Sequence, residues 1–331
     1  MQTFSARAHA KINLGLRVLG RRADGYHELR TIFQTLRLAD RLRVRLEPGR
    51  GVALDCRPAA GAPAAWLQAP PGAANLAWRA AELAAEAFGL RRRITIELEK
   101  HIPLQAGLGG GSSDAATILE ILAAAAPRRP TAETLWRLAA ELGSDVPYFL
   151  VGGTAVGLGR GEEIYPLPEL PAWSCVLALP RTAGIETRGA FAAWDAAHPA
   201  AWTPEATSAK LAFCSSLWRA LPVSRPRRDR GRGARTTAAP GPKVRAGIAN
   251  DLAEVVFPLS PDFRAIHRAF AAAPVLGTGL SGSGAAQFAL LSDARQARLW
   301  SRRWQQRWGP LWLTALLGRG AYRHRIRRLP A

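Results

Sequence analysis

Hydrophobic and polar residues alternate along the first hundred residues in the way that β-strands require. From residue 12 to residue 18 every second position is Ile, Leu or Val, and the positions between them are polar or glycine. Because side chains in a strand alternate between two faces, this pattern predicts a half-buried strand with Lys11 and Asn13 together on its polar face. Further strands are expected at residues 31–33, after an Asp24-Gly25 turn, and at residues 42–46 and 94–98.

Three later segments carry the three- and four-residue spacing of helices instead. Residues 75–89 are rich in Ala and end at a glycine. Hydrophobic residues at positions 115, 118, 119 and 122 repeat as one face of a helix, and this pattern stops before Pro127. A third helix is expected to begin with Thr131 as its N-cap and to end at Gly143. The N-terminal half therefore consists of strands followed by helices.

The pattern starts afresh near residue 170, where we place a domain boundary. A hydrophobic strand at residues 175–179 opens the second part, and another strand is expected at residues 287–291. This divides the chain into an N-terminal domain of residues 1–170 and a C-terminal domain of residues 171–331. Residues 224–243 consist mainly of Arg, Pro, Gly and Thr with almost no large hydrophobic residue, which predicts a flexible insertion in the second domain.

A helix near the C-terminus carries Trp300, Trp304 and Trp308 on one stripe. A tryptophan stripe beside arginines is compatible with a membrane surface or with stacked bases. The stripe is also compatible with a helix face that packs into the core while its flanking arginines extend to solvent. This core interpretation is favoured, because such packing is far more common.

Composition narrows the class of protein. The chain has 331 residues, of which 48% are hydrophobic and 21% charged, so wholesale disorder is excluded. No hydrophobic run approaches the ~20 residues of a membrane-spanning helix, and the first residues lack the hydrophobic run of a signal peptide. The three cysteines are widely spaced, without a CxxC pair, which argues against a disulfide framework or a cysteine zinc site. We expect a cytoplasmic protein, with no membrane partner.

The net charge of +20 at first suggests nucleic acid as a partner. Its distribution weakens that interpretation. Residues 225–245 carry a net charge of +7 and residues 287–331 a net charge of +9, so most of the excess lies in two segments and not across one binding face. Basic runs of this kind are commonly solvated, and no nucleic-acid partner is expected. Nothing in the sequence specifies an oligomeric state.

One segment carries most of the chemical information. It contains four glycines within five positions, followed by two hydroxyl residues and the start of a helix. Glycines let the backbone turn its N–H groups inward, and a helix start offers unpaired N–H groups with a partial positive charge. Together they predict a polyphosphate site, since a simple turn with a serine cap does not need four glycines. The predicted ATP-binding residues are Pro103, Leu104, Gln105, Ala106, Gly107, Leu108, Gly109, Gly110, Gly111, Ser112 and Ser113.

The spacing of this segment excludes a Walker A loop and a dinucleotide fingerprint, and it resembles the central motif P-x-x-x-G-L-G-[GS]-S-S of the GHMP kinase superfamily. Gln105 stands where many members carry a small residue. Other segments resemble one branch, the 4-diphosphocytidyl-2-C-methyl-D-erythritol kinases. They are AKINL at residues 10–14, RADGYHEL at 22–29, GSDVPYF at 143–149, GLGRGE at 157–162 and LSGSG at 280–284. Order and spacing agree from about residue 8 to residue 291.

The resemblance implies an α+β protein with the two-domain GHMP kinase fold. Its N-terminal domain would be like domain 2 of ribosomal protein S5, its C-terminal domain would be ferredoxin-like, and the active site would lie between them. It implies ATP-dependent phosphorylation of the 2-hydroxyl of 4-diphosphocytidyl-2-C-methyl-D-erythritol in the non-mevalonate route to isoprenoid precursors, with ATP and Mg²⁺ as cofactors. No decisive metal carboxylate is evident, and Ser113 is a candidate hydroxyl ligand.

The same resemblance assigns roles to five residues. Asp145 would be the general base and Lys11 its electrostatic support. Asn13 would orient the acceptor hydroxyl, and Tyr26 and His27 would hold the cytosine. From the local sequence alone, Asp145 before Pro147 would be interpreted as an Asx turn or a helix cap.

Two other functions stay open at this point. One is another small-molecule kinase of the GHMP superfamily, although such an enzyme gives no reason for the Asp-Gly-Tyr-His segment. The other is a basic RNA-binding protein with an S5-like domain, which would bind RNA with a steep salt dependence and have no kinase activity.

Overall fold

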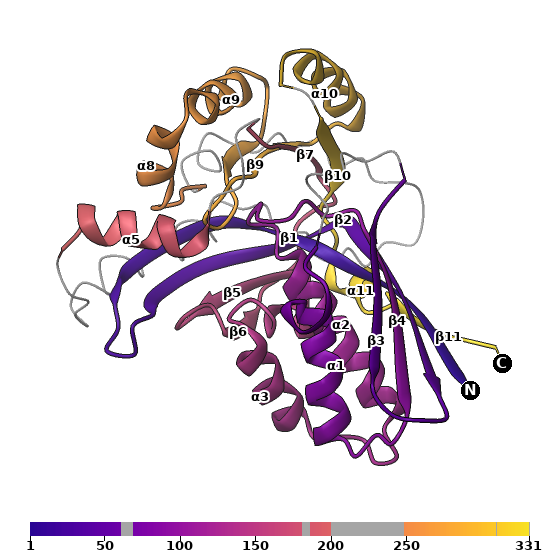
Figure 1. Ribbon diagram of the computed structural model, residues 1–331. Coiled ribbons are helices and arrows are strands. Elements are labelled where there is room, and N and C mark those ends of the chain that lie inside the picture. The colour runs from indigo at the N-terminus through magenta and orange to yellow at the C-terminus, as the bar shows by residue number, and fades with distance from the viewer. Residues whose placement is uncertain (61–68, 181–185, 200–247, 309, 331) are drawn as a thin grey trace.

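The computed structural model describes residues 1–60, 69–180, 186–199, 248–308 and 310–330, and its longest sheet belongs to the N-terminal half (Figure 1). Seven strands form this sheet in the order β11-β1-β2-β4-β3, with the hairpin β5–β6 attached to β2. All its pairings are antiparallel except the parallel pair β3–β4. The strands are β1 (Gln2–Arg21), β2 (His27–Glu47), β3 (Val52–Pro58), β4 (Arg93–Lys100), β5 (Thr154–Leu158), β6 (Glu163–Pro166) and β11 (Ile326–Leu329).

The long strand β2 corrects the sequence prediction, which divided it into two. Its middle part contains Gln34 and Thr35, polar residues that break the hydrophobic alternation although both are buried. Gln34 Nε2 donates to the carbonyl of Leu317, and Thr35 Oγ1 lies 2.6 Å from the hydroxyl of Tyr148. Distant partners therefore satisfy these groups, and the strand continues through them. Strand β3 was not predicted at all.

The helices between residues 76 and 142 lie along one face of this sheet (Figure 1), and a short helix at residues 148–151 packs beside them. Asn75 caps the first by accepting a hydrogen bond from Ala77 N–H, and Thr131 caps the third by accepting one from Thr134 N–H. These two helices and the helix beginning after Gly109 confirm the sequence prediction. The four are α1 (Leu76–Ala87), α2 (Gly110–Ala125), α3 (Ala132–Leu142) and α4 (Tyr148–Val151).

The second sheet has four antiparallel strands in the order β10-β7-β9-β8. Counted along the chain, this is the 4-1-3-2 order of a ferredoxin-like βαββαβ unit. Helices α9 and α10 cover one face, where Trp304 is buried and Trp300 and Trp308 pack partly buried, which confirms the core interpretation of the tryptophan stripe. The elements are β7 (Ser174–Ala178), α9 (Pro261–Ala271), β8 (Gly277–Leu280), β9 (Gln287–Leu291), α10 (Ala294–Trp308) and β10 (Leu311–Ala315).

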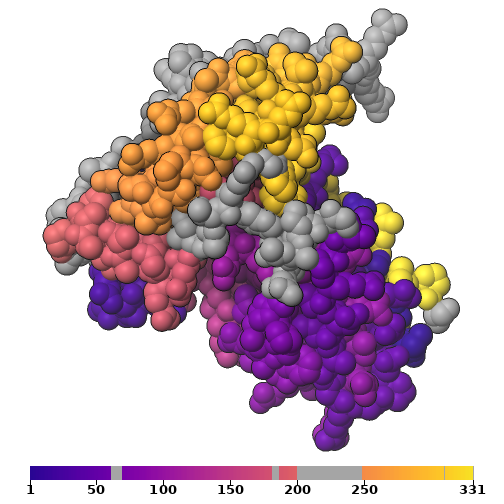
Figure 2. Space-filling view, turned by 45° about the horizontal axis from the view of Figure 1, so that its top comes forward, coloured from indigo at the N-terminus to yellow at the C-terminus, as the bar shows by residue number. Residues whose placement is uncertain are grey.

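The two sheets pack against each other through β1. Ile12 and Leu14 share a core with Leu177 and Phe288 of the second sheet, so β1 is covered on both sides and not half-exposed as predicted. Figure 2 shows α5 and the described residues from 250 to 308 gathered as one lobe against the N-terminal part. Two helices complete this lobe, α5 (Thr187–Ala197) and α8 (Ala253–Val256).

The chain does not divide cleanly at residue 170. That position lies between β6 and β7, which belong to different sheets, but the last residues return to the first sheet. Helix α11 (Arg319–Tyr322) places the buried Tyr322, whose hydroxyl donates to the carbonyl of Phe149, and β11 then pairs with β1. The N-terminal unit therefore includes residues 319–329. The predicted insertion at residues 224–243 lies outside the described residues.

Among the described residues, none of the helices combines the length and the hydrophobicity needed to span a membrane.

Candidate active site

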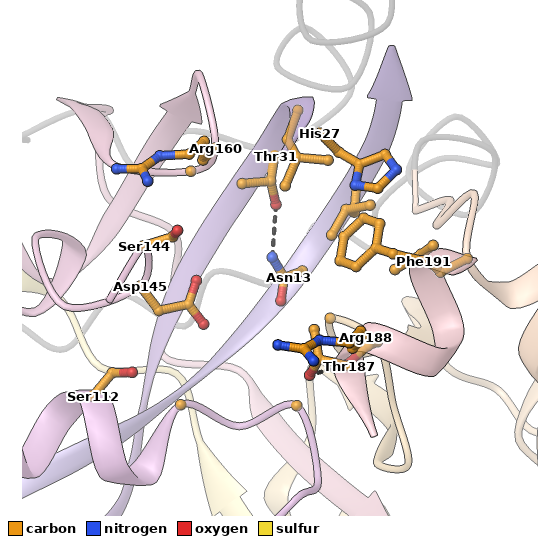
Figure 3. A pocket seen from close by; sticks show the side chains of 18 of the residues that line it. Asn13, His27, Thr31, Ser112, Ser144, Asp145, Arg160, Thr187, Arg188 and Phe191 are labelled. Carbon is orange, nitrogen blue, oxygen red and sulfur yellow. Dashed lines mark hydrogen bonds between the residues drawn. The ribbon is translucent and has the colours of Figure 1, made fainter. Parts of the chain in front are cut away.

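A cavity of about 930 Å³ opens between the glycine-rich loop, the strands β1 and β2, and helix α5 (Figure 3). It brings together residues from both halves of the chain. Lys11, Asn13, Tyr26, His27 and Asp145 all line it, so the five residues expected to contact the acceptor or the reacting atoms share one space. Of the eleven predicted ATP-binding residues, residues 103–112 line the cavity and Ser113 does not.

The glycine-rich loop has the backbone geometry of a phosphate cradle. Gly107 and Gly109 adopt φ values of 71° and 68°, in the left-handed region that favours glycine, and α2 begins directly after Gly109. The unpaired N–H groups of the first turn of α2 therefore face the end of the loop. Gln105 also adopts a left-handed backbone, with φ 51°. The loop therefore turns here even though Gln105 replaces the small residue that many members of the superfamily carry at this position.

Neighbouring segments hold this loop in position from two sides. On one side Lys11 N–H of β1 donates to the carbonyl of Leu108 at 2.9 Å. On the other side the turn at residues 281–286 contacts it, since Ser281 Oγ donates to the carbonyl of Gly107 at 2.9 Å and Ala286 N–H donates to that of Ala106 at 3.0 Å. A Cβ at Gly107 would lie 2.0 Å from the Ser281 carbonyl oxygen, so only glycine permits this approach.

A buried ionic cluster lies behind the loop. The Lys100 ammonium donates to Asp40 and, at 2.6 Å, to Asp114 of α2, and all three side chains are almost completely buried. The second oxygen of Asp40 accepts the N–H groups of His101 and Ile102, which lead into the loop. Burial raises the pKa of Asp114, and the Lys100 cation beside it opposes this effect. The cluster thus fixes both ends of the loop to β2 and β4.

Ser112 and Ser113 differ in what they can contact. Ser112 lines the cavity, whereas the Ser113 hydroxyl is fully buried and has no hydrogen-bond partner among the described residues. The position of Ser113 on the inner face of α2 therefore contradicts its prediction as a phosphate or metal ligand. Ser112 is the hydroxyl that a ligand in the cavity can reach.

Lys11 and Asp145 form an ion pair at the wall of the cavity, with 3.2 Å between Nζ and Oδ2. Lys11 is almost completely buried, and Asp145 keeps 36% of its side chain exposed. Lys11 Nζ also donates to Asn13 Oδ1 at 2.8 Å, and Asn13 Nδ2 donates to Thr31 Oγ1 at 2.7 Å (Figure 3). The Thr31 hydroxyl in turn donates to the carbonyl of Gly15, so this chain of bonds fixes the Asn13 amide and the ammonium together.

The turn that carries Asp145 explains its exposure. Val146 N–H donates to the carbonyl of Gly143 at 3.0 Å, which closes a tight turn with Asp145 at its tip. Helix α4 has Pro147 and not Asp145 as its N-cap, so the capping role that the local sequence suggested is absent. The carboxylate points into the cavity, opposite Asn13 (Figure 3).

Aromatic side chains line the other end of the cavity. The imidazole of His27 stacks on Phe191 of α5 with 4.5 Å between ring centroids, and its Nε2 lies 2.6 Å from a carboxylate oxygen of Asp195. Asp195 accepts this hydrogen bond, so Nε2 carries the proton and Nδ1 is left for a ligand. Tyr26 is half exposed, and the Arg160 guanidinium lies 4.5 Å from its ring centroid.

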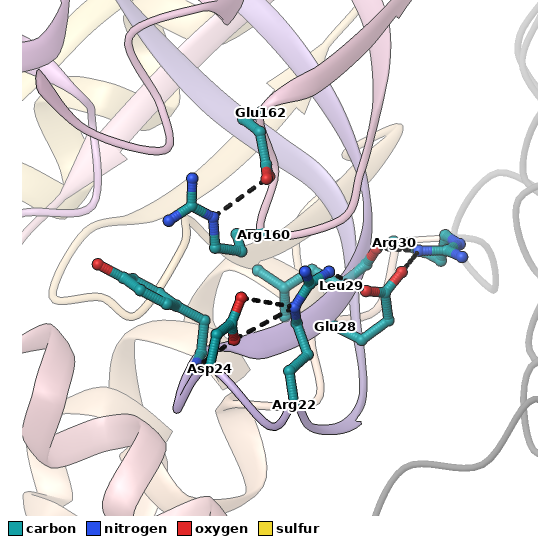
Figure 4. A network of polar contacts seen from close by, with 8 residues as sticks. Arg22, Asp24, Glu28, Leu29, Arg30, Arg160 and Glu162 are labelled. Atoms are coloured by element: carbon teal, nitrogen blue, oxygen red, sulfur yellow. Dashed lines mark hydrogen bonds and ion pairs between the residues drawn. The ribbon is translucent and has the colours of Figure 1, made fainter. Parts of the chain in front are cut away.

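Charged side chains stiffen the turn that presents Tyr26 and His27 (Figure 4). Arg22 donates to Asp24 at 3.1 Å and to Glu28 at 2.8 Å, and Asp24 also accepts the N–H of Tyr26. Arg160, which faces Tyr26, is held by Glu162 at 3.0 Å. Ion pairs and hydrogen bonds on both sides of Tyr26 therefore hold the loop between β1 and β2 in place.

Several residues of the cavity were not predicted from the sequence. Phe191 and Asp195 lie in an Ala-rich helix without any local motif, and only their contacts with His27 reveal them. Arg160 lies inside the segment 157–162 that carried the resemblance, so the motif itself was the available signal. Thr31 lies in the expected strand at residues 31–33, where nothing in the sequence marked it as a cavity residue. Thr187 and Arg188, at the start of α5, had no signal in the sequence.

Comparisons with known proteins agree with this geometry. The sequence-family model for the GHMP kinase N-terminal domain matches residues 75–153. The family model for the GHMP kinase C-terminal domain matches residues 238–310. A solved structure of 4-(cytidine 5'-diphospho)-2C-methyl-D-erythritol kinase superposes with a TM-score of 0.70 and 33% identity, covering 95% of this chain and 99% of that one. A homoserine kinase from Cytophaga hutchinsonii shares the fold, with a TM-score of 0.66 and 17% identity. The predicted two-domain GHMP kinase fold is confirmed.

Curated relatives narrow the family further. The 4-diphosphocytidyl-2-C-methyl-D-erythritol kinase of Solibacter usitatus is 40% identical over 290 residues, which cover 87% of this chain and 81% of the relative. The enzyme of the same name from Moorella thermoacetica is 39% identical over 298 residues, covering 90% and 93%. The chain is therefore a kinase that belongs to the 4-diphosphocytidyl-2-C-methyl-D-erythritol kinase family of the GHMP superfamily.

Proposed function

We propose that this kinase transfers the γ-phosphoryl group of ATP to the 2-hydroxyl of 4-diphosphocytidyl-2-C-methyl-D-erythritol, a step in the non-mevalonate route to isoprenoid precursors. The observation that carries the proposal is the ion pair of Lys11 and Asp145, 3.2 Å apart, in the same cavity as the glycine-rich loop. A base for the acceptor hydroxyl and a cradle for the donor phosphates thus face one space, which is what in-line phosphoryl transfer requires.

The ATP phosphates bind to the loop of residues 103–112. Backbone N–H groups at the start of α2 donate to phosphate oxygens, and the partial positive charge of the helix start favours their negative charge. Because hydrogen bonds from β1 and from residues 281–286 already hold the loop, these donors are in place before the nucleotide arrives.

Asp145 accepts the proton of the acceptor hydroxyl as its oxygen bonds to the γ-phosphorus and ADP leaves. The Lys11 ammonium, 3.2 Å from this carboxylate, stabilises negative charge on the attacking oxygen and the transferred group. Asn13 fixes the ammonium, since its Oδ1 accepts from Lys11 Nζ while Thr31 holds its amide nitrogen. The remaining N–H of Asn13 is the donor that orients the hydroxyl.

The donors around the loop fit a magnesium ion bound mainly by the nucleotide. Among the described residues no three His, Cys, Asp or Glu side chains lie close enough together to hold a metal. Mg²⁺ commonly keeps several waters and is held by substrate phosphates with one or two protein oxygens, and the Ser112 hydroxyl is the available oxygen on α2. When bound, the ion neutralises charge on the phosphates.

The aromatic end of the cavity fits a cytosine base. Tyr26 offers an exposed ring face for stacking, and His27 offers a fixed acceptor at Nδ1 for the exocyclic amine of the base. The cavity links this end to Asp145, so an acceptor with a base at one end and an alcohol at the other spans the two.

We also propose a cytoplasmic location, because Cys56 and Cys175 are free thiols, as expected in a reducing compartment.

The test is product formation by purified protein with ATP, Mg²⁺ and the cytidyl diphosphate alcohol, read by mass, with Asp145→Asn beside the wild type. We expect the variant to fold normally and to lose turnover by about 10²–10⁴-fold. Asp55→Asn, which removes an exposed carboxylate on β3, is the matched control and should keep wild-type turnover.

Wild-type turnover in Asp145→Asn would remove Asp145 from the role of base. Equal turnover of the methylerythritol alcohol with and without its cytidyl group would instead favour a different GHMP acceptor, because the aromatic end of the cavity would then contribute nothing.

A further inference from the structure

One face of helix α5 lines the cavity over two turns. Arg188, Phe191, Ala192 and Asp195 all contribute to the wall, at the spacing i, i+3, i+4 and i+7 of a single helix face. Phe191 and Asp195 fix the C-terminal part of this face to His27, by stacking and by a 2.6 Å hydrogen bond. The position of Arg188 relative to the aromatic end is therefore set by the helix itself.

The other end of α5 is attached to the segment that holds the glycine-rich loop. Thr187 Oγ1 lies 2.9 Å from Ser283 Oγ, and the same turn contacts the loop through Ser281 and Gly107. Arg188 follows Thr187 directly, between this attachment and the aromatic end. Figure 3 shows its guanidinium pointing into the cavity beneath Asn13.

Arg188 is a cation without a counter-charge in the described structure. Most charged side chains of the cavity wall are paired there: Lys11 with Asp145, Arg160 with Glu162, and Asp24 with Arg22. Arg188 forms no ion pair or hydrogen bond with any residue that the structure describes.

Arg21 lines the cavity and is likewise without an ion pair among the described residues, but it lies at the end of β1 beside the Tyr26 turn. Among the described residues, Arg188 is thus the unpaired cation on the stretch of wall between the base end and the reacting pair. A guanidinium placed in this way favours an anionic ligand, and its fork of donors matches phosphate oxygens.

We propose that Arg188 binds the diphosphate of the acceptor, and so selects a nucleoside diphosphate derivative over a neutral alcohol; this rests on the proposed function. With a helical rise of ~1.5 Å per residue, Arg188 lies about 4.5 Å along the axis from Phe191, in the direction away from Asp195. A diphosphate joining a base beside His27 to a hydroxyl beside Asp145 passes through this interval. The donor phosphates have their own cradle in the glycine-rich loop.

The experiment compares ligands that differ only in the diphosphate. Binding of CDP and of cytidine is measured by calorimetry for wild type, Arg188→Ala and Arg188→Lys, with Arg264→Ala on the exposed side of α9 as the control. We expect Arg188→Ala to weaken CDP about 10- to 100-fold and cytidine less than about 2-fold, as for the loss of a charge-assisted hydrogen bond. Arg188→Lys should retain part of the CDP affinity, and Arg264→Ala all of it.

Steady-state kinetics gives the second measurement, in which KM for the cytidyl diphosphate alcohol rises in Arg188→Ala while KM for ATP stays within about 2-fold. Equal losses for CDP and cytidine would overturn the proposal, since Arg188 would then only support the helix. A rise confined to KM for ATP would also overturn it, by assigning the residue to the donor. Should the wild type fail to phosphorylate the alcohol, the proposed function fails, while the ratio of CDP to cytidine affinity still reports on Arg188.

Discussion

Replacing Gly107 with alanine tests whether the close contact between the loop and the turn at residues 281–286 positions the phosphate cradle. The added Cβ would lie 2.0 Å from the carbonyl oxygen of Ser281 and 2.9 Å from that of Gly284. Both neighbours are backbone atoms, so no side-chain rotation relieves the overlap. The φ of 71° at Gly107 adds a further cost of about 1–2 kcal/mol for any residue with a Cβ.

The size of the effect follows from the displacement that alanine requires. Ordinary contact begins near 3.4 Å, so the loop and the turn must separate by about 1.4 Å. This movement breaks the bond from Ser281 Oγ to Gly107 and the bond from Ala286 N–H to Ala106. A misplacement of ~1 Å costs about 100-fold in phosphoryl transfer, and we expect kcat/KM for ATP to fall by at least that factor.

The assay is steady-state turnover with varied ATP, together with thermal unfolding of the same preparations. Gly189→Ala is the matched control, because a Cβ at that position on α5 meets no atom of the described residues within 4 Å. It should keep wild-type kinetics and gain slightly in helix stability. Wild-type kcat/KM for ATP in a folded Gly107→Ala variant would refute the reasoning, since the clash would then have no consequence for the cradle.

Two further predictions concern buried ionisable groups away from the reacting atoms. Burial lowers the pKa of His9 to about 4, below the unfolded value of about 6.5, so the buried neutral imidazole contributes its full stability above pH 6.5. As pH falls towards 4, protonation of the unfolded state removes about 3 kcal/mol of this stability. Chemical unfolding between pH 7 and pH 4 should show a free energy of unfolding that falls less steeply with pH for His9→Gln than for wild type, and equal slopes would contradict this. Lys100→Met leaves Asp40 and Asp114 buried without their cation. Urea unfolding at pH 7 should show a free energy of unfolding lower by about 3–5 kcal/mol. A decrease of less than about 1 kcal/mol would contradict a stabilising role of the ionic cluster.

The parts of the fold and site that could be predicted are those encoded by neighbouring residues. The glycine-rich loop was predictable because its glycines, serine and helix start are consecutive. The helices with Asn75 and Thr131 caps were predictable for the same reason. Lys11 and Asp145 are far apart in the sequence, and the local pattern around Asp145 indicated a different role. Only the resemblance to a family brought these two together.

The parts that could not be predicted depend on partners distant in the chain. Strand β2 was divided because Gln34 and Thr35 look like a break, yet the carbonyl of Leu317 and the hydroxyl of Tyr148 satisfy them in the interior. The contribution of α5 to the cavity was invisible for a similar reason, since nothing near Phe191 indicates that it will stack on His27. A buried polar side chain is recognisable only once its partner is known.

The return of the final residues to the first sheet has a consequence for the order of synthesis. Strand β11 covers the edge of β1, and Tyr322 fills the space beside Gly152, where a Cβ would lie 2.1 Å from its ring. During translation the N-terminal lobe therefore emerges with an open edge and an unfilled cavity, and both close only when residues 319–329 have been synthesised. Separately expressed halves of this enzyme would each lack a piece that the other carries.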